Sequence, residues 1–182
     1  ESERFLREGK WLARRMDLGA TVRGKRLGIL GLGRIGRAVA RRAEVVGLHI
    51  AYHDIKPMGD LIYRSYPTLR ALADASDILL VACEGGQATV GLIDGDVLDA
   101  LGPDGYLINA ARGTIVDQPA MIAALREGRI AGAALDVFGG EPEVPAELLA
   151  LENVVLTPHI ASSTVETRRA MGDLVYDNIR AH

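Results

Sequence analysis

The sequence contains little sulfur and few aromatic side chains. Its 182 residues include one cysteine, Cys83, one tryptophan and two phenylalanines, and aromatic residues make up 4% of the chain. A single cysteine excludes a disulfide bond within this chain and is typical of a reducing compartment. We therefore expect a cytoplasmic protein.

Long apolar runs and an excess of charge of one sign are also lacking. No apolar stretch reaches the ~18 residues of a membrane-spanning helix, and the formal net charge is −3. These features predict a protein with neither a membrane surface nor a nucleic-acid surface. Hydrophobic residues at 48% and charged residues at 25% are typical of a globular domain. We predict no metal site.

Residues 25–54 have the pattern of strand, glycine turn, helix, strand and acid. An apolar run at 27–30 leads into the turn, and a second one at 48–52 follows the helix. Gly47 stands where a left-handed residue is expected to end the helix. The expected apolar side of the helix consists of Ile35, Val39 and Val46.

Each part of this pattern has a physical role in binding a dinucleotide. Gly31 allows a tight turn, Gly33 lets the backbone approach a pyrophosphate, and Gly36 lets the helix pack on its strand. The N–H groups at the helix start, where Arg34 and Ile35 lie, form an anion site. Asp54 lies 18 residues after Gly36, close to the ~20-residue interval of a ribose-binding carboxylate. The alternative is a glycine-rich turn without a ligand.

Strands and helices alternate along the rest of the chain. Further strands are predicted at 77–81, 105–109, 130–137 and 154–157. Helices are predicted at 1–15, broken near Gly9, at 68–75, capped by Thr68, at 94–101 and 117–127, capped by Asp94 and Asp117, and from Ser162 or Ser163 to the end. Residues 55–66 are expected to form a connector. This alternation predicts an α/β fold, a doubly wound parallel sheet of Rossmann type that binds NAD(P).

Polar residues follow three successive predicted strands. Arg112 follows the fourth strand, Asp136 and Glu141 the fifth, and His159 the sixth. An arginine fork holds a carboxylate or polarises a carbonyl, a histidine exchanges a proton with the carbonyl oxygen, and Glu141 would favour the imidazolium. Each residue alone could be an ordinary surface group, but the three strand ends meet at the ligand edge of such a sheet.

The motifs GLGRIG, LINAARGTIVD, GAALDVFGGEP and TPHI, in this order, resemble those of the D-isomer-specific 2-hydroxyacid dehydrogenases. The resemblance implies that Arg112, Glu141 and His159 form the catalytic set and that Asp136 contacts the nicotinamide amide. It further implies NAD(P)-linked interconversion of a 2-keto acid and a D-2-hydroxy acid. The sequence most resembles the glyoxylate and hydroxypyruvate reductase branch. Glu141 argues against the formate dehydrogenases, which carry glutamine there.

Two further positions at strand ends are expected to contact the cofactor, Cys83 and Ala111. For Cys83 the alternative interpretation is a small buried hydrophobe. The loop after the third strand departs from the Pro-Leu-Thr frequent in the family, because Glu84 follows Cys83. A carboxylate pointing into a site for anionic substrates would be unfavourable, so we predict that Glu84 points to solvent.

The charge at the end of the second strand favours NAD over NADP. Asp54 would repel a 2′-phosphate, and no arginine follows it directly. Lys56 lies two residues on and could still reach a phosphate, as could Arg64 in the connector. We predict NAD, with NADP as the less favoured cofactor.

We expect residues 1–182 to be one dinucleotide-binding domain. The resemblance implies that the helices at 1–15 and 163–182 cross to a substrate domain that is absent from this chain. The chain alone is then expected to bind cofactor and to turn over poorly. The resemblance also implies a homodimer through this domain, with Trp11 near the interface.

Two other protein classes share parts of the pattern. A non-catalytic NAD-sensing domain of corepressor type uses the same fold and retains the same three polar residues, so activity must separate the two. A methyltransferase also shows a glycine-rich turn and an acid after the second strand. It has no need for Arg112, Glu141 and His159.

Overall fold

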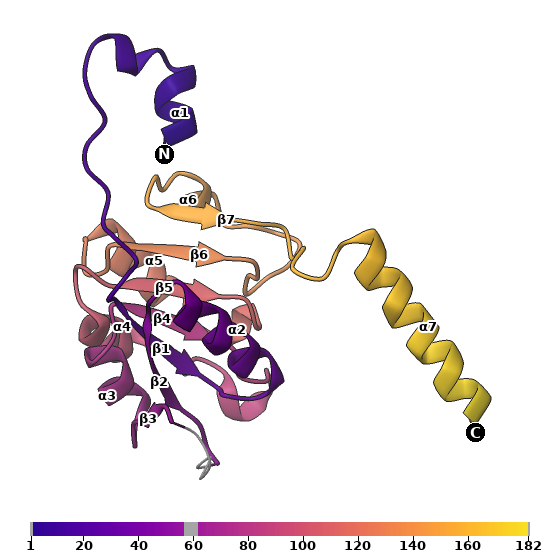
Figure 1. Ribbon diagram of the computed structural model, residues 1–182. Helices are drawn as coiled ribbons and strands as arrows, with labels where there is room; N and C mark the ends of the chain where they lie inside the picture. The colour runs from indigo at the N-terminus through magenta and orange to yellow at the C-terminus, as the bar shows by residue number, and fades with distance from the viewer. Residues whose placement is uncertain (1, 57–61, 182) are drawn as a thin grey trace.

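The computed structural model describes residues 2–56 and 62–181. Within these residues the chain forms one parallel sheet of seven strands, in the order β3-β2-β1-β4-β5-β6-β7 (Figure 1). The strands are β1 Arg26–Leu30, β2 His49–His53, β3 Arg64–Ser65, β4 Ile78–Val81, β5 Tyr106–Asn109, β6 Gly132–Leu135 and β7 Val154–Leu156. The predicted Rossmann-type α/β fold is confirmed.

The helices lie between the strands, as predicted. They are α1 Ser2–Arg7, η1 Lys10–Leu12, α2 Arg34–Val45, α3 Leu69–Asp74, η2 Gln87–Thr89, α4 Gly95–Leu101, η3 Gly113–Ile115, α5 Gln118–Arg126, α6 Ala146–Leu149 and α7 Val165–Ala181. Thr68, Asp94 and Asp117 cap α3, α4 and α5, because each side chain accepts a backbone N–H from the first turn. Gly47, after α2, has φ +86°, the left-handed conformation expected there.

The strand order reverses between β1 and β4, and this reversal positions the site. Leu30 at the end of β1 is level with His53 of β2 on one side and Val81 of β4 on the other. The helices after β1 and β4 pack against opposite faces, so these carboxyl ends form the switch point of the sheet. In doubly wound sheets ligands bind outside the carboxyl ends at such a switch point.

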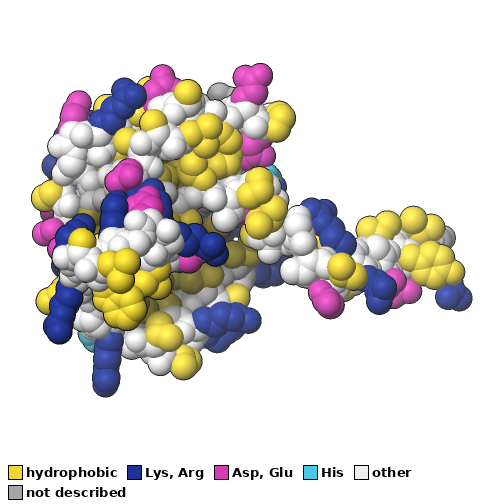
Figure 2. All heavy atoms as spheres, turned by 90° about the horizontal axis from the view of Figure 1, so that it is seen from above, with side chains coloured by type: hydrophobic (Ala, Val, Ile, Leu, Met, Phe, Trp, Pro, Cys, Tyr) yellow, Lys and Arg dark blue, Asp and Glu magenta, His cyan; other side chains and the backbone are white. Residues whose placement is uncertain are grey.

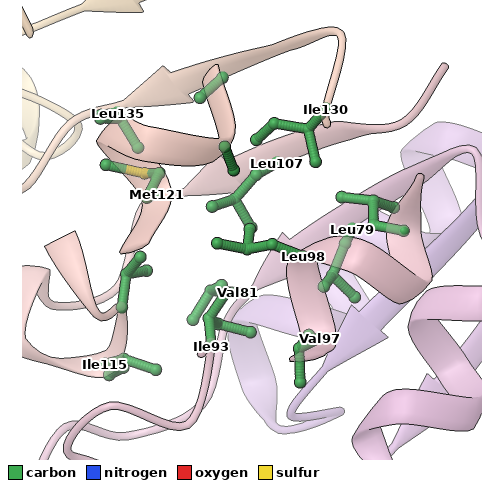
Figure 3. Close-up of a cluster of buried hydrophobic side chains, with 14 of the residues drawn as sticks. Leu79, Val81, Ile93, Val97, Leu98, Leu107, Ile115, Met121, Ile130 and Leu135 are labelled. Atoms are coloured by element: carbon green, nitrogen blue, oxygen red, sulfur yellow. The ribbon is translucent and has the colours of Figure 1, made fainter. Parts of the chain in front are cut away.

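One face of the sheet is fully covered. Alternate residues of the central strands, such as Leu79 and Val81 of β4 and Leu107 of β5, point toward α4 and α5 (Figure 3). There they meet Leu98 of α4 and Met121 of α5, all at most 2% exposed. This packed aliphatic layer fixes the distances between neighbouring strand ends, because close-packed interiors have low compressibility.

The other face is covered by α2 alone, and its packing differs from the prediction. The buried side of α2 consists of Gly36, Ala40 and Ala43. Of the predicted apolar side, Val39 is partly buried and packs against the core, but Ile35 is 66% exposed and Val46 57% exposed, so the prediction is confirmed for Val39 and wrong for the other two. The reason is the close approach of helix and strand, which leaves room only for small side chains.

Beyond α2 this second face carries an open apolar groove. It is lined by Leu27, Val39, Arg42, Ala43, Val46, Leu48, Ile78, Leu80 and Ile108. Further along the same face, Tyr106 of β5 and Val155 of β7 remain 47% and 65% exposed. The face packed on α4 and α5 is therefore buried more completely than the face packed on α2.

The two terminal segments lie outside this body. In residues 2–24 and 162–181 the structure buries no side chain, and α7 projects away from the sheet with apolar and charged side chains along its length (Figures 1 and 2). At the other end, Arg4 of α1 reaches Glu152 at 3.3 Å. The predicted N-terminal helix does break near Gly9, but its second part, η1, ends at Leu12 and does not reach residue 15. None of the described helices is long and apolar enough to span a membrane.

Three local predictions are corrected, and one helix was not predicted. The expected connector at 55–66 contains the edge strand β3, in which Arg64 pairs with Ala51; residues 57–61 lie outside the described part. The fifth predicted strand is shorter, Gly132–Leu135, and α6 follows it unpredicted. The last helix is capped by Thr164, whose Oγ1 accepts the Thr167 N–H at 3.1 Å, and not by Ser162 or Ser163. Two-residue strands and one-turn helices carry too few residues to show a period.

Candidate cofactor and catalytic site

The glycine turn after β1 is shaped by close contacts of its first and third glycines. Gly31 has φ +90°, and a Cβ there would lie 2.5 Å from the Cα of Cys83. A Cβ on Gly36 would lie 2.2 Å from the Gly31 carbonyl oxygen. Both distances are far below van der Waals contact, so the turn requires glycine at these two positions.

The second glycine of the turn faces open space. A Cβ on Gly33 would meet no heavy atom within 4 Å, although Gly33 stands directly before α2 and its N-terminal N–H groups. Arg34 and Ile35 in the first turn of α2 are both exposed. An unfilled space at a helix N-terminus fits a pyrophosphate group.

The carboxylate after β2 is held by backbone donors. Asp54 Oδ2 accepts the Leu32 N–H at 2.8 Å, and Oδ1 accepts the Lys56 N–H at 3.1 Å. These bonds tie the end of β2 to the glycine turn and fix the negative charge beside it. Of the two cations predicted to compete with it, Lys56 is exposed, and the guanidinium of Arg64 stacks on Tyr66 at 4.8 Å from the ring centroid.

The loop after β4 forms the opposite wall of the turn. Cys83 is half-buried and packs against the apolar core, and burial raises the pKa of its thiol. Cys83 therefore packs as a small hydrophobic residue, which was the alternative interpretation. Its Cα also lies next to Gly31 of the glycine turn. Glu84 is exposed, as predicted. The next residue, Gly85, lies against Arg112, because a Cβ there would be 2.5 Å from the Arg112 Cγ.

The loop that carries Arg112 is organised by Asn109, which is 1% exposed. Its Nδ2 donates to the Arg112 carbonyl oxygen at 3.0 Å, and its Oδ1 accepts the Ala111 N–H at 3.1 Å. Gly113 packs so tightly on Phe138 that a Cβ would lie 2.0 Å from its backbone. Arg112 itself donates from Nη1 to the Ala111 carbonyl at 2.7 Å.

Glu141 and His159 form a hydrogen-bonded pair. Glu141 Oε2 lies 2.7 Å from His159 Nδ1, and Oε1 accepts the Phe138 N–H at 2.9 Å. The bond from His159 and then the one from Phe138 hold the pKa of Glu141 below its ordinary value, and the charge of Arg112 acts in the same direction. Because an ionised carboxylate only accepts, the proton of the pair is on Nδ1, and Nε2 is left to exchange a proton with a bound molecule.

Asp136, at the end of β6, faces the segment that carries His159. Its carboxylate accepts the hydroxyl of Thr157 and the N–H groups of Ile160 at 3.0 Å and Ala161 at 3.1 Å. Burial alone would raise the pKa of Asp136, but these bonds together keep the pKa below its ordinary value. The sequence pattern singled out Asp136 as a strand-end acid and not as the holder of this segment.

The structure thus brings the predicted residues to one edge of the sheet. Gly31, Gly33, Gly36, Asp54 and Cys83 lie at the ends of β1, β2 and β4, and Ala111, Arg112, Asp136, Glu141 and His159 at or just after the ends of β5, β6 and β7. Two supporting residues were not predicted, Asn109 and Thr157. Each lies two residues before a predicted site residue, Ala111 and His159 respectively, and this position was the available signal. Among the described residues no three His, Cys, Asp or Glu side chains are grouped to hold a metal ion.

The glycine turn, Arg112 and the Glu141–His159 pair lie at one edge of the sheet. This combination is typical of the NAD(P)-binding domain of an oxidoreductase. Residues 1–161 match the family model of the D-isomer specific 2-hydroxyacid dehydrogenases, NAD binding domain. The chain belongs to this family. The methyltransferase alternative is thereby excluded.

Relatives of the chain are reductases of small keto acids. It is 53% identical over 184 residues to a glyoxylate/hydroxypyruvate reductase of Arabidopsis thaliana and 45% identical over 181 residues to a 2-ketogluconate reductase of Gluconobacter oxydans. All of the chain aligns with each, but only 58% of each relative is covered. A solved NADPH-dependent glyoxylate/hydroxypyruvate reductase of Sinorhizobium meliloti, in complex with NADP and malonate, is 49% identical with a TM-score of 0.93. That match covers 98% of this chain and 57% of the other.

Proposed function

We propose that this domain serves the NAD(H)-linked interconversion of a small 2-keto acid and a D-2-hydroxy acid, with glyoxylate or hydroxypyruvate as the expected substrates. The observation that carries the proposal is the Glu141–His159 pair, 2.7 Å apart, on the same sheet edge as the glycine turn. A proton donor beside a nicotinamide site is what the reduction of a carbonyl requires. Similarity to reductases of these acids supports the choice of substrate.

Arg112, His159 and Glu141 each have a distinct proposed role. Arg112 binds the substrate carboxylate, since its planar fork matches that group. His159 donates a proton from Nε2 to the carbonyl oxygen during reduction and takes it back during oxidation. Glu141 holds the ring and favours its protonated form. The bound nicotinamide would supply or accept the hydride.

We propose that the cofactor is NAD, with NADP less favoured. Gly31, Gly33 and Gly36 would admit the pyrophosphate, and Arg34 and Ile35 border it from α2. Asp54 supports NAD because its two backbone bonds hold its charge beside the glycine turn, and a carboxylate after the second strand would repel a 2′-phosphate. The NADP complex of the Sinorhizobium relative makes this the point most in need of a test.

Three further residues are proposed to contact the cofactor. Asp136 retains acceptor capacity for the nicotinamide amide beyond the three bonds that it accepts. Cys83 and Ala111 lie just after β4 and β5, which are neighbouring strands on one side of β6. Backbone and small side chains there would leave the nicotinamide ring room to lie flat.

We also propose that residues 1–15 and 163–182 contact a substrate domain. Support comes from the exposed apolar side chains of α7, among them Met171, Leu174 and Val175, and from the greater length of the relatives. A homodimer through this domain, with Trp11 near the interface, is the proposed assembly, and Trp11 is 68% exposed. Sedimentation of the protein at micromolar concentration as a monomer would contradict the dimer.

The test is a side-by-side titration with NADH and NADPH, followed by turnover of glyoxylate and hydroxypyruvate in the full-length protein. Tighter binding of NADH together with turnover is expected. Equal or tighter binding of NADPH would show that Lys56 or Arg64 overrides Asp54. Binding of NADH without turnover of any 2-keto acid would favour the NAD-sensing alternative.

A further inference from the structure

Four hydrogen bonds join the segment that carries His159 to one residue, Asp136. Three donors of this segment reach the Asp136 carboxylate, namely the Thr157 hydroxyl and the N–H groups of Ile160 and Ala161. A fourth bond runs from the His159 N–H to the Asp136 carbonyl oxygen at 2.9 Å. No side-chain hydroxyl other than that of Thr157 takes part in this set.

His159 needs such support because its backbone is in an unfavourable conformation. Its φ is +50°, and it is the one described residue other than glycine with a positive φ. A side chain in this region costs energy that surrounding contacts must offset. The conformation is useful, since it places the ring 2.7 Å from Glu141 Oε2. Weaker support would let the ring leave that position.

We propose that Thr157 is a positioning residue for proton transfer, acting through the Asp136 carboxylate on the backbone that holds His159 against Glu141. This inference rests on the proposed function, because it assigns Thr157 a part in the same reaction. Thr157 does not have to touch substrate or cofactor for this. Its own N–H already donates to the Leu135 carbonyl at 3.0 Å, which fixes the residue at the end of β7.

The hydroxyl matters because all the partners of the Asp136 carboxylate are donors. The carboxylate must therefore stay ionised, as a protonated oxygen would face an N–H group. Asp136 is half-buried, which disfavours the charge, and the Thr157 hydroxyl lowers the pKa of Asp136 against that effect. Removing the hydroxyl would make the side chain of Asp136 more mobile. It would also weaken the hydrogen bonds that Asp136 accepts from the N–H groups of Ile160 and Ala161.

The test compares Thr157→Val, Thr157→Ser and Thr68→Val in the full-length protein. Valine keeps the shape of threonine and removes the hydroxyl, whereas serine retains it. We expect Thr157→Val to lower kcat about tenfold, with the KM values for NADH and glyoxylate within about twofold, and Thr157→Ser to restore most of the rate. Thr68→Val is the matched control, because its hydroxyl oxygen accepts the Ala71 N–H. Thr68 follows β3, the outer strand on the other side of the sheet from β7. Thr68→Val should lower thermal stability and leave kcat unchanged.

A second readout does not depend on turnover. In the ¹⁵N spectrum of the imidazole rings at alkaline pH, where the rings are neutral, the His159 signals, assigned with His159→Asn, should show one tautomer with the proton on Nδ1. Thr157→Val should spread these signals between tautomers, whereas Thr157→Ser should not. If the parent protein reduces no 2-keto acid, the proposed function fails, and this spectrum still decides the role of Thr157.

A double-mutant cycle tests the route through Asp136. If Thr157 acts through that carboxylate, Thr157→Val added to Asp136→Asn should reduce kcat little further. Fully additive effects would overturn the proposal. So would a Thr157→Val protein with lower thermal stability but unchanged kcat and imidazole spectrum, or one with a raised KM for glyoxylate and unchanged kcat, which would indicate direct contact with substrate.

Discussion

At the carboxyl end of β1 the candidate site consists of backbone and open space, whereas at the ends of β5, β6 and β7 it consists of side chains held by hydrogen bonds. A Cβ on Gly33 would meet no heavy atom within 4 Å, while the side chain of Asp136 alone accepts three hydrogen bonds. The first region is suited to admit a large rigid anion. The second is suited to hold a proton donor in one orientation.

The largest effect is expected from removing the proton donor. His159→Asn should lower kcat for glyoxylate reduction by about 10² to 10⁴ and leave NADH affinity nearly unchanged, because the glycine turn is untouched. Stopped-flow absorbance of NADH measures both quantities. His49→Asn is the control, since His49 is exposed at the start of β2, on the opposite edge of the sheet. A loss of NADH binding in His159→Asn equal to the loss of rate would contradict the division between the two regions.

Next in size is the effect of filling the open space. Gly33→Ala should weaken NADH binding at least about tenfold with little change in folding stability, because its φ of −71° suits alanine and the methyl meets no protein atom. Fluorescence titration and thermal unfolding of the same samples measure both. Gly95→Ala, whose methyl also meets no atom, is the matched control without a binding effect.

Gly36→Ala separates packing from binding within the same turn. Its methyl would lie 2.2 Å from the Gly31 carbonyl oxygen, so we expect a loss of about 1–3 kcal/mol in the free energy of unfolding together with weaker binding. If Gly33→Ala destabilised the fold as much as Gly36→Ala, the space at Gly33 would not be open.

The contrast between the regions also explains what could be predicted from sequence. Gly36 and Asp54 contact neighbours within one strand–turn–helix–strand unit, so the spacing within that unit indicated the site, although the closest neighbour of Gly31, Cys83, lies after β4. The parallel sheet followed in the same way from alternation. Asn109 and Thr157 were missed because their hydrogen bonds depend on side-chain rotamers and, for Thr157, on a partner 21 residues away in the chain. The exposed Ile35 was assigned to a buried side because periodicity carries no information on how closely a helix approaches its sheet.

Glu141→Gln should have a smaller effect than loss of the histidine, and one that depends on pH. The pKa of Glu141 is lowered, so the carboxylate is ionised throughout the neutral range and favours a protonated ring. Glutamine can keep the hydrogen bond but not the charge. We expect kcat to fall about tenfold and the basic limb of the pH profile of reduction to move to lower pH. An unmoved basic limb would show that the charge of Glu141 does not set the protonation of its partner.

The smallest effect is expected at the amino edge of the sheet, where a carboxylate contributes stability without chemistry. Asp77 accepts the Arg26 N–H at 2.7 Å and pairs with its guanidinium at 3.0 Å, and the bonds from Arg26 lower the pKa of Asp77 to about 2. Because this pKa lies below the ordinary value of 3.8, the pair stabilises the fold fully above about pH 4 and loses its contribution as the pH falls through about 2. Since Arg26 is half-exposed, Asp77→Asn should cost about 1 kcal/mol at pH 7, and thermal unfolding should show the two proteins converging near pH 2. A difference that persisted at pH 2 would assign the effect to packing, and altered NADH binding would show that the two edges of the sheet are coupled.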